Sequence, residues 1–373
     1  MITITGTLSK AWMNRAIGVV FDRGYYFDPG KRHAIDCLCN QYAAKTFPDM
    51  AVFYSESNLG RINYWDKDQV LIGGIQPNMI LGMLLGADFV PADNRDADIT
   101  PCCLKHVGWA LAHADNPGTD KREQHGLKPI LPAPEALLNH DLIRLFDEQI
   151  ESATKGRLRP IPPFFWDSSG RAVIHGVLTT AQKLCGETIF MDMLTQPAKC
   201  MRLLNWIADA YIVLCRHFAQ AAGLPITDVH VGECSCCMIS PALVEEFVAP
   251  VTSRIGEALG SVRFHSCGTS THLLQALTRI DPLHSLDLGS ETSIRKTREI
   301  FGREMPITIA PSPHALSAES AEPIWDWAKR VLEENAGGHL GFVYHLEPSY
   351  NVDTIYALTD FVQHQTGGLR NGR

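Results

Sequence analysis

The sequence predicts an α/β protein, built as a (β/α)8 TIM barrel with an N-terminal extension. Predicted strands and helices alternate from about residue 170 onward, which is typical of a parallel sheet. No linker rich in Pro, Gly or Ser interrupts 170–365. The 373 residues exceed the length of about 250 residues that such a barrel needs. We therefore expect one domain over 1–373, of which about 1–100 includes the extension.

The first part of the chain mixes short helical and strand-like pieces. Hydrophobic spacing predicts a strand over 51–55 and helices over 32–45, 78–86 and 133–155. This part should supply the strands that complete the barrel, together with an insertion. Phe164, Phe165 and Trp166 end a proline-rich loop. These aromatic side chains either line a pocket or form a latch that packs on the core.

The second part of the chain has regular alternation. Pro197 begins a long helix to residue 222, and Ser240 with Pro241 supplies an N-cap and a first-turn proline for a helix through about residue 259. The expected strands cover 172–176, 227–233, 261–267, 283–288, 305–310 and 340–346. Further helices are expected over 270–279, 293–301, 319–335 and 352–363. Short loops between these units favour a closed barrel over an open sheet.

Charge and composition exclude several classes of protein. The formal net charge is -8 and the chain has no long Lys/Arg run, so we expect no nucleic-acid partner and no binding to an anionic membrane surface. No apolar stretch reaches the length of about 18 residues that a spanning helix needs. The amino terminus lacks a signal-peptide pattern, and 11 cysteines without one indicate a reducing compartment, so a cytoplasmic location is expected.

Polar and titratable residues follow the predicted strands. In an α/β barrel the catalytic groups lie at the carboxyl ends of the strands. These ends carry His175, Glu233, His265, Cys267, Asp287, His314, His345 and Glu347. Each has a structural alternative: His175 could be a hydrogen-bonded core histidine, and Asp287 could cap the following helix. Glu233 follows a strand that should lie inside the barrel, so its carboxylate needs a cation or hydrogen-bond donors.

His265 and Cys267 are two residues apart on a predicted strand, so their side chains should project on the same side. Imidazole nitrogen and thiolate sulfur are ligands that zinc prefers. Cys234 and Cys237 form a CxxC spacing, but a structural four-cysteine zinc site would need a second such pair, and a redox role for this pair is the weaker interpretation. The pattern predicts a metal site at the barrel mouth, provided that a third ligand converges on it.

The second part of the chain resembles the uroporphyrinogen decarboxylase superfamily. The likeness rests on 238–250 (MISPALVEEFVAP), 263–268 (RFHSCG) and the later Leu286-Asp287, and it covers about 170–365. Within the superfamily the sequence is most similar to the zinc-dependent corrinoid methyltransferases, such as the methylcobalamin:coenzyme M methyltransferases, which carry His-x-Cys-Gly at this place. The resemblance implies a barrel with zinc at its mouth.

The resemblance also implies a set of ligands. His265 and Cys267 match the first two zinc ligands of the family. The third is a cysteine after the last strand, where this chain has His345-Leu346-Glu347. Glu347 is therefore the expected third ligand, with His345 as second choice, and Glu233 could complete the set. Cys234 or Cys236 is an alternative that would compensate for the missing cysteine. Glu233 and Asp287 are the expected catalytic proton carriers.

The function implied is a zinc-dependent methyltransferase that moves a methyl group between a small substrate, of methoxy, methylamine or thiol type, and a corrinoid cobalt. The chain lacks the Asp-x-His-x-x-Gly motif that ligates cobalamin, so the corrinoid should be carried by a partner protein. A homodimer is left open. Two alternatives remain: a metal-independent decarboxylase of the uroporphyrinogen type, whose arginine-rich amino-terminal motif is not found here, and a non-catalytic metal-binding barrel.

Overall fold

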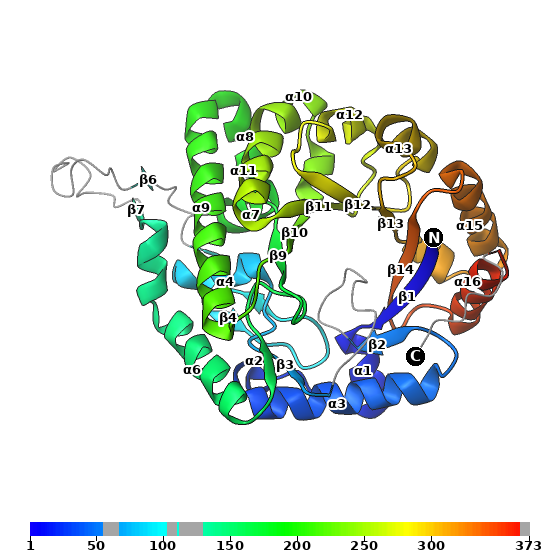
Figure 1. Ribbon diagram of the computed structural model, residues 1–373, viewed down its shortest axis with the longest axis horizontal. Coiled ribbons are helices and arrows are strands. Elements are labelled where there is room, and N and C mark those ends of the chain that lie inside the picture. Colours follow the sequence, from blue (N-terminus) through cyan, green and yellow to red (C-terminus); the bar gives the residue numbers. More distant parts are fainter. Residues whose placement is uncertain (55–66, 103–109, 112–129, 366–373) are drawn as a thin grey trace.

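The computed structural model describes residues 1–54, 67–102, 110–111 and 130–365. Its centre is a curled sheet of eight parallel strands in the order β2-β1-β14-β13-β12-β11-β10-β9 (Figure 1). The strands of this sheet are β1 (Ile2–Leu8), β2 (Val52–Tyr54), β9 (Arg171–His175), β10 (Asp228–Gly232), β11 (Ser261–Ser266), β12 (Leu283–Leu288), β13 (Ile307–Ile309) and β14 (Leu340–Leu346). The predicted α/β class with an eight-stranded parallel sheet is confirmed.

The first strand lies inside the sheet. β1 pairs with β14 over its whole length and with β2 on its other side. An extension preceding the barrel is therefore not confirmed, because the sheet already includes Ile2. Within the described residues no ladder joins β2 to β9, so the sheet is curled with two edges, whereas the sequence predicted a closed barrel.

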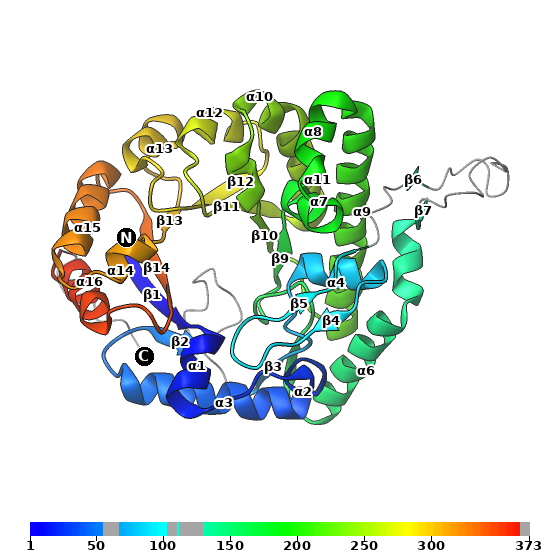
Figure 2. The same cartoon turned by 180° about the vertical axis from the view of Figure 1, so that it is seen from behind.

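The segment between β2 and β9 contributes small elements near this gap. Two strands, β3 (Gln69–Leu71) and β8 (Arg159–Ile161), form a separate parallel pair. The other short strands are β4 (Phe89–Val90) paired with β5 (Asp98–Ile99), and β6 (Ala110–Leu111) paired with β7 (Ile130–Leu131). Figure 2 shows β3, β4 and β5 beside β9, on the side of the gap. The insertion expected from the sequence thus lies between the second and third strands of the sheet.

The helices surround the sheet as an outer ring (Figures 1 and 2). In the first half they are α1 (Lys10–Ile17), α2 (Arg23–Phe27), α3 (Pro29–Thr46), α4 (Pro77–Leu84), η1 (Pro134–Asn139), α6 (Asp141–Lys155), α7 (Val177–Cys185), α8 (Thr188–Thr195) and α9 (Pro197–Ala222). In the second half they are η2 (Cys234–Met238), α10 (Pro241–Leu243), η3 (Val244–Val248), α11 (Ala249–Leu259), η4 (Thr271–Leu273), α12 (Leu274–Leu277), α13 (Ile294–Phe301), α14 (Pro313–Leu316), α15 (Glu322–Asn335) and α16 (Val352–Gln365).

Strand alternation separates a hydrophobic outer face from a polar inner face. In β11, Val262 and Phe264 are completely buried, and Val262 lies close to the helix glycine Gly256 of α11. Arg263 and His265 occupy the alternate positions and therefore point to the inside of the sheet. The apolar core thus lies between the sheet and the helices, and the interior of the ring is left for polar chemistry.

Several predicted boundaries are confirmed. The helix at 197–222 and the strands at 283–288 and 340–346 have the predicted bounds. The predicted helix at 240–259 begins as expected, because the Ser240 side chain accepts a hydrogen bond from the Leu243 amide, but five of its residues form a π-helical turn, η3. The sequence interpretation placed no strand at 2–8 and no helices at 177–185 or 188–195.

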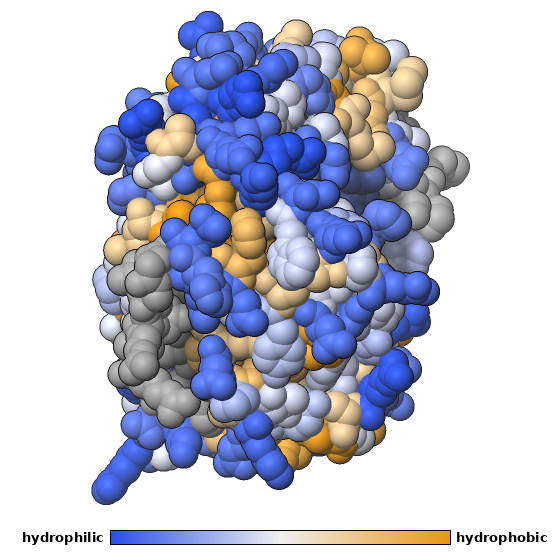
Figure 3. All heavy atoms as spheres, turned by 90° about the vertical axis from the view of Figure 1, so that its right-hand side faces the viewer, coloured by the Kyte–Doolittle hydropathy of each residue, from blue (hydrophilic) through white to orange (hydrophobic). Residues whose placement is uncertain are grey.

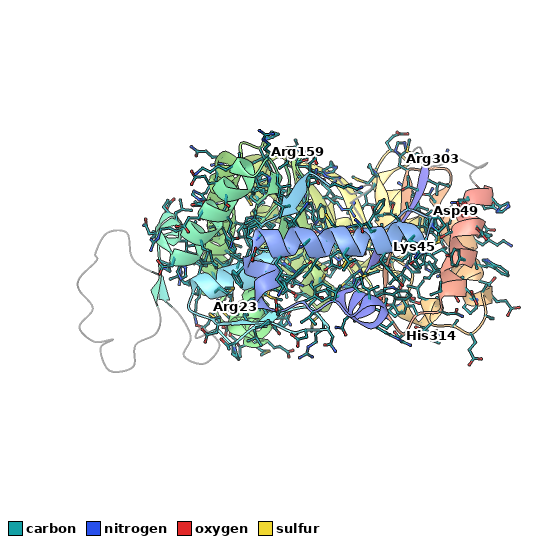
Figure 4. All side chains as sticks on the ribbon, turned by 90° about the horizontal axis from the view of Figure 1, so that it is seen from below. Arg23, Lys45, Asp49, Arg159, Arg303 and His314 are labelled. Atoms are coloured by element: carbon teal, nitrogen blue, oxygen red, sulfur yellow. The ribbon has the colours of Figure 1, made fainter. Side chains whose placement is uncertain are left out.

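The two ends of the sheet face opposite sides of the ring, as Figure 4 shows. Arg303 precedes β13 and His314 follows it, and the two residues lie at opposite edges of the molecule. Polar side chains dominate the face in Figure 3, with smaller apolar areas between them. Trp325 and Tyr356 are among the exposed apolar residues of the described chain. None of the helices in the described ranges combines the length and apolar character needed to cross a bilayer.

Candidate metal centre

Three potential metal ligands meet at the carboxyl ends of β10 and β11. Cys234, His265 and Cys267 each offer one donor atom, and these atoms lie within 4.8 Å of one another. We call these three residues the Cys-His-Cys group. Cys234 and His265 are half-buried and Cys267 is exposed, so the group lies at a surface opening rather than in the core.

Backbone pairing brings the group together. Gly232, the last residue of β10, lies beside His265 of β11, and the Glu233 amide donates to the His265 carbonyl at 2.8 Å. β10 then gives way to the short helix η2, which starts with Cys234. β11 ends at Ser266, and Cys267 follows directly. Adjacent parallel strands therefore place a cysteine from one strand end next to the His-x-Cys pair of the other.

The three side chains are coupled electrostatically. Hydrogen bonds from Cys234 and His265 lower the pKa of the Cys267 thiol, so its thiolate form is favoured. The same hydrogen bond raises the pKa of Cys234, because that thiol holds the shared proton, and burial adds to this effect. Burial lowers the pKa of His265, but the carboxylate of Asp287 and the sulfur of Cys267 more than offset it and raise this pKa to about 9. A bound cation would release these protons.

Asp287 connects His265 to a buried arginine. Its Oδ2 lies 3.1 Å from His265 Nδ1 and 2.6 Å from a guanidinium nitrogen of Arg263. Arg263 also donates to Thr308 Oγ1 at 3.0 Å. Burial raises the pKa of Asp287, but Arg263 and His265 outweigh burial and lower it overall. A carboxylate behind a histidine is the arrangement that orients metal-ligating imidazoles in proteins.

Glu233 lies outside the Cys-His-Cys group. Its carboxylate accepts from the amides of Leu178 and Thr179, at 3.1 and 2.7 Å, and from Thr179 Oγ1 at 2.8 Å. It is completely buried, and burial raises its pKa to about 7 while these hydrogen bonds oppose the shift. The donors required by the sequence argument are thus supplied by the first turn of α7. Gly176 is needed beside it, because a Cβ there would lie 2.0 Å from Glu233 Oε2.

Glu347 and His345, the predicted third ligands, lie at the other side of the ring. His345 Nδ1 is 2.7 Å from Thr7 Oγ1 of β1, and its Nε2 is 3.6 Å from Glu347 Oε1. Glu347 also interacts with Ser9, which opposes the rise in pKa that burial gives its carboxyl. The structure therefore does not bring Glu347 or His345 into the Cys-His-Cys group; the third member is Cys234, one of the alternatives for a compensating cysteine.

Cys236 and Cys237, the other cysteines of this region, make contacts outside the Cys-His-Cys group. Cys236 is buried and its sulfur contacts Ser266 Oγ at 3.7 Å. Cys237 donates to the Cys234 carbonyl at 3.1 Å, which is a contact within one turn of η2. The CxxC pair is thus divided, because Cys234 joins the His-x-Cys pair and Cys237 does not. Cys103 falls outside the described residues.

A cavity of about 530 Å³ opens beside the Cys-His-Cys group. The three residues of the group line it, together with His175 and the aromatic loop residues Phe164, Phe165 and Trp166. The loop therefore fulfils both alternatives, because its three aromatic residues line the cavity and are also buried against the core, where Phe164 packs on Tyr211 and Phe218. Such a volume is typical of sites for small molecules, and the lining combines apolar walls with a few polar groups.

The charged residues in the cavity wall are paired with one another. Lys10 contacts Asp96 and Arg32 contacts Asp36, each at 2.7 Å. Arg171 is paired with Asp167. The sequence interpretation did not single out these six residues, because they come from five separate parts of the chain: α1, α3, the loop between β4 and β5, the loop between β8 and β9, and β9 itself. No shared motif or spacing in the sequence indicated that these residues, which lie far apart in the chain, would converge.

His175 differs from these paired residues. It lines the cavity at the end of β9, and its buried Nδ1 has no hydrogen-bond partner within the described part of the chain. Burial lowers its pKa to about 4, with a further contribution from His265, so the imidazole is neutral. The core alternative for His175 predicted a hydrogen-bonded ring, and Nδ1 has no such bond within the described residues. His314, in contrast, is exposed on α14 and does not line the cavity.

Comparison with protein families matches residues 172–364 to the Uroporphyrinogen decarboxylase (URO-D) family. The match covers just over half of the chain, so this protein belongs to the URO-D family. A search of curated protein sequences found no match.

Solved structures similar to the chain include the following two. A methyltransferase from Methanosarcina mazei has a TM-score of 0.59 and 14% sequence identity, and the alignment covers 98% of this chain and 92% of that one. A B12-independent methionine synthase from Shewanella sp. W3-18-1, in complex with selenomethionine, has a TM-score of 0.40 and 13% identity over 60% of this chain and 67% of the other. The first similarity establishes a shared fold.

Proposed function

We propose that this chain is a zinc-dependent methyltransferase, which transfers a methyl group between a small substrate and the cobalt of a separate corrinoid protein. The observation that carries the proposal is the Cys-His-Cys group, whose donor atoms lie within 4.8 Å of one another beside a cavity. The resemblance of 263–268 to the zinc-dependent corrinoid methyltransferases supports it. We propose one URO-D-like domain over 1–373 and a cytoplasmic location.

The donor set fits zinc. Two cysteine sulfurs and one imidazole nitrogen are among the ligand combinations that catalytic zinc sites use, with a further position for substrate. We keep His265 and Cys267 as ligands and propose Cys234 in place of Glu347 and Glu233. The reason is that Glu233 already accepts three hydrogen bonds from α7, and Glu347 is engaged with His345 and Ser9.

The chain's own residues have separate roles in this mechanism. When bound, zinc supplies Lewis acidity toward the heteroatom of the substrate. Asp287 holds the imidazole of His265 in place and is itself held by Arg263. Glu233 anchors the segment that carries Cys234 to α7. We thus propose that Asp287 and Glu233 act as positioning residues, a narrower role than the proton transfer expected from the sequence.

The cavity favours a small substrate without several negative charges. Each arginine or lysine in its wall faces an aspartate, at the pairs Lys10 with Asp96, Arg32 with Asp36 and Arg171 with Asp167. A tetrapyrrole polycarboxylate would need an excess of cationic groups, and among the described residues of this wall each cation is paired with an aspartate. A methoxy, methylamine or thiol compound fits the balanced charge better, and the corrinoid would meet it on a partner protein.

Metal analysis tests the proposal. Protein purified without chelator should contain one zinc ion per chain, and the His265→Ala and Cys267→Ser variants should lose it. Glu347→Gln is the matched control and should retain the metal, because Glu347 lies outside the Cys-His-Cys group. A wild-type protein that is fully active without metal contradicts the proposal.

An activity assay separates an enzyme from a binding protein. Methyl transfer should be followed from a methylated amine or a methoxylated aromatic compound to cob(I)alamin, and from methylcobalamin to a small thiol, which releases cob(I)alamin. We expect transfer with the wild type and none with Cys267→Ser. Metal binding without transfer to or from any cobalamin form would favour the non-catalytic barrel, and carbon dioxide release from a porphyrinogen would favour the decarboxylase.

A further inference from the structure

One lateral row of residues crosses the sheet at the level of the Cys-His-Cys group. His175 of β9 is paired with Gly232 of β10, and Gly232 is paired with His265 of β11. Laterally paired residues of a parallel sheet point to the same face, and all three residues line the cavity. The row therefore presents two imidazole rings to the cavity with a glycine between them, and the ring of His230, two residues before Gly232, packs beside His265 at a centroid distance of 5.7 Å.

Neither the surrounding contacts nor the backbone conformation requires a glycine at position 232. A Cβ on Gly232 would lie 3.6 Å from the Ile174 carbonyl oxygen and 3.8 Å from His230 Nε2, which are ordinary contacts. Gly232 is also absent from the glycines of the described chain with positive φ, so its backbone would accept a side chain. Gly176 is different, because there a Cβ collides with Glu233. We call the space beside Gly232, between His175 and His265, the Gly232 notch.

His175 forms one side of this notch. Its Nδ1 is buried without a partner among the described residues, whereas the lysine and arginines of the cavity wall are paired with aspartates. The ring of His175 nevertheless lines the cavity, so a polar group of a ligand can meet the histidine there through its other nitrogen, Nε2. On the other side of the notch, His265 belongs to the Cys-His-Cys group.

We propose that the Gly232 notch receives the heteroatom end of the substrate, and that His175 forms a hydrogen bond with this end while it lies next to the metal. The ligand is a small molecule with one thiol, ether or amine terminus, whose apolar body lies against the loop of Phe164, Phe165 and Trp166. Gly232 is thus a specificity-determining position and His175 a substrate-binding residue. The inference rests on the proposed function and assigns the substrate end of the same site.

The test uses the full-length protein loaded with Co²⁺ and titrated with 2-mercaptoethanol as the probe. Binding of the thiol is followed by the change in thiolate-to-cobalt absorption. Gly232→Ala should weaken thiol binding by roughly tenfold or more, because one methyl group takes up ligand space. His175→Ala should weaken it by about fivefold, the effect of one hydrogen bond, and His175→Gln should restore part of the loss. Cobalt content should stay at one per chain in each variant.

Gly341→Ala is the matched control. Gly341 belongs to the same row of the sheet, next to Thr308, but it does not line the cavity. Its variant should bind thiol like the wild type.

Thiol affinity that is unchanged in both Gly232→Ala and His175→Ala, at full cobalt content, overturns the inference and leaves the proposed function standing. A wild type whose cobalt spectrum does not respond to thiol also overturns it. Protein that takes up no cobalt removes the proposed function and the inference with it.

Discussion

Each side of the ring carries a histidine followed two residues later by a second potential metal ligand, but the two sides use this pair differently. At the ends of β10 and β11, Cys234, His265 and Cys267 place their donor atoms within 4.8 Å of one another. At the end of β14, His345 is 2.7 Å from Thr7 of β1, and its other nitrogen faces Glu347. A histidine and a second potential ligand two residues later occur on both sides. The two sides differ in their neighbouring strand. β10 leads into Cys234, a third potential ligand, whereas β1 supplies the hydroxyl group of Thr7.

The largest difference should be in how much stability is lost when the carboxylate next to each histidine, Asp287 or Glu347, is removed. Asp287→Ala leaves Arg263 buried without its carboxylate, and breaking such a buried pair costs about 3–5 kcal/mol of unfolding free energy. Glu347→Ala removes a half-exposed partner of His345 and should cost less than about 1 kcal/mol. Urea unfolding of both variants, with chelator present so that metal does not contribute, measures the contrast. Equal losses would refute it.

The second effect concerns the ligand that distinguishes the two sides. Cys234→Ser should weaken zinc binding by at least about 100-fold, because serine offers no thiolate. This loss exceeds the usual effect of removing a residue that only hydrogen-bonds to a metal ligand. Cys237→Ser is the control, since Cys237 donates to a backbone carbonyl within η2. Competition with a chromophoric chelator gives both affinities. Similar losses for the two variants would point to the CxxC pair as the metal site.

A smaller effect is expected from the anchor beneath Cys234. The Thr179 hydroxyl donates to Glu233 and accepts from the Ser235 amide, and these two residues flank Cys234 in the sequence. Thr179→Val removes both hydrogen bonds. We expect a loss of about 1–3 kcal/mol in unfolding free energy and roughly tenfold weaker zinc binding. Thr180→Val, which removes the contact with Tyr211, should reduce stability and leave zinc affinity unchanged. If zinc affinity falls equally in both, Glu233 has no positioning role.

The smallest effect belongs to the β14 side. Thr7→Val removes the hydrogen bond to His345 and should lower the unfolding free energy by about 1 kcal/mol. Zinc content and affinity should not change. A loss of zinc in this variant would show that His345 or Glu347 contributes to the metal site after all.

Much of the fold could be predicted because its signals are local. The helix at Pro197–Ala222 has a first-turn proline, and Gly223 at its end has the positive φ that terminates helices. Leu283–Leu288 and Leu340–Leu346 are apolar runs of strand length. β1 escaped prediction although Ile2–Leu8 alternates isoleucine with threonine, residues that favour strands. Its main partner, β14, lies at the far end of the sequence, so no neighbouring strand–helix unit marked it.

By itself the sequence determined the His-x-Cys pair, because residues two apart in extended chain share a face, and Cys267 directly follows the strand that carries His265. It also determined that Glu233 must be satisfied by donors, since a carboxylate in a buried strand end cannot stay unpaired. Only the tertiary structure decided that Cys234, rather than Glu347, completes the Cys-His-Cys group. Strand order and register set that distance: β10 is the neighbour of β11, whereas β12 and β13 separate β11 from β14.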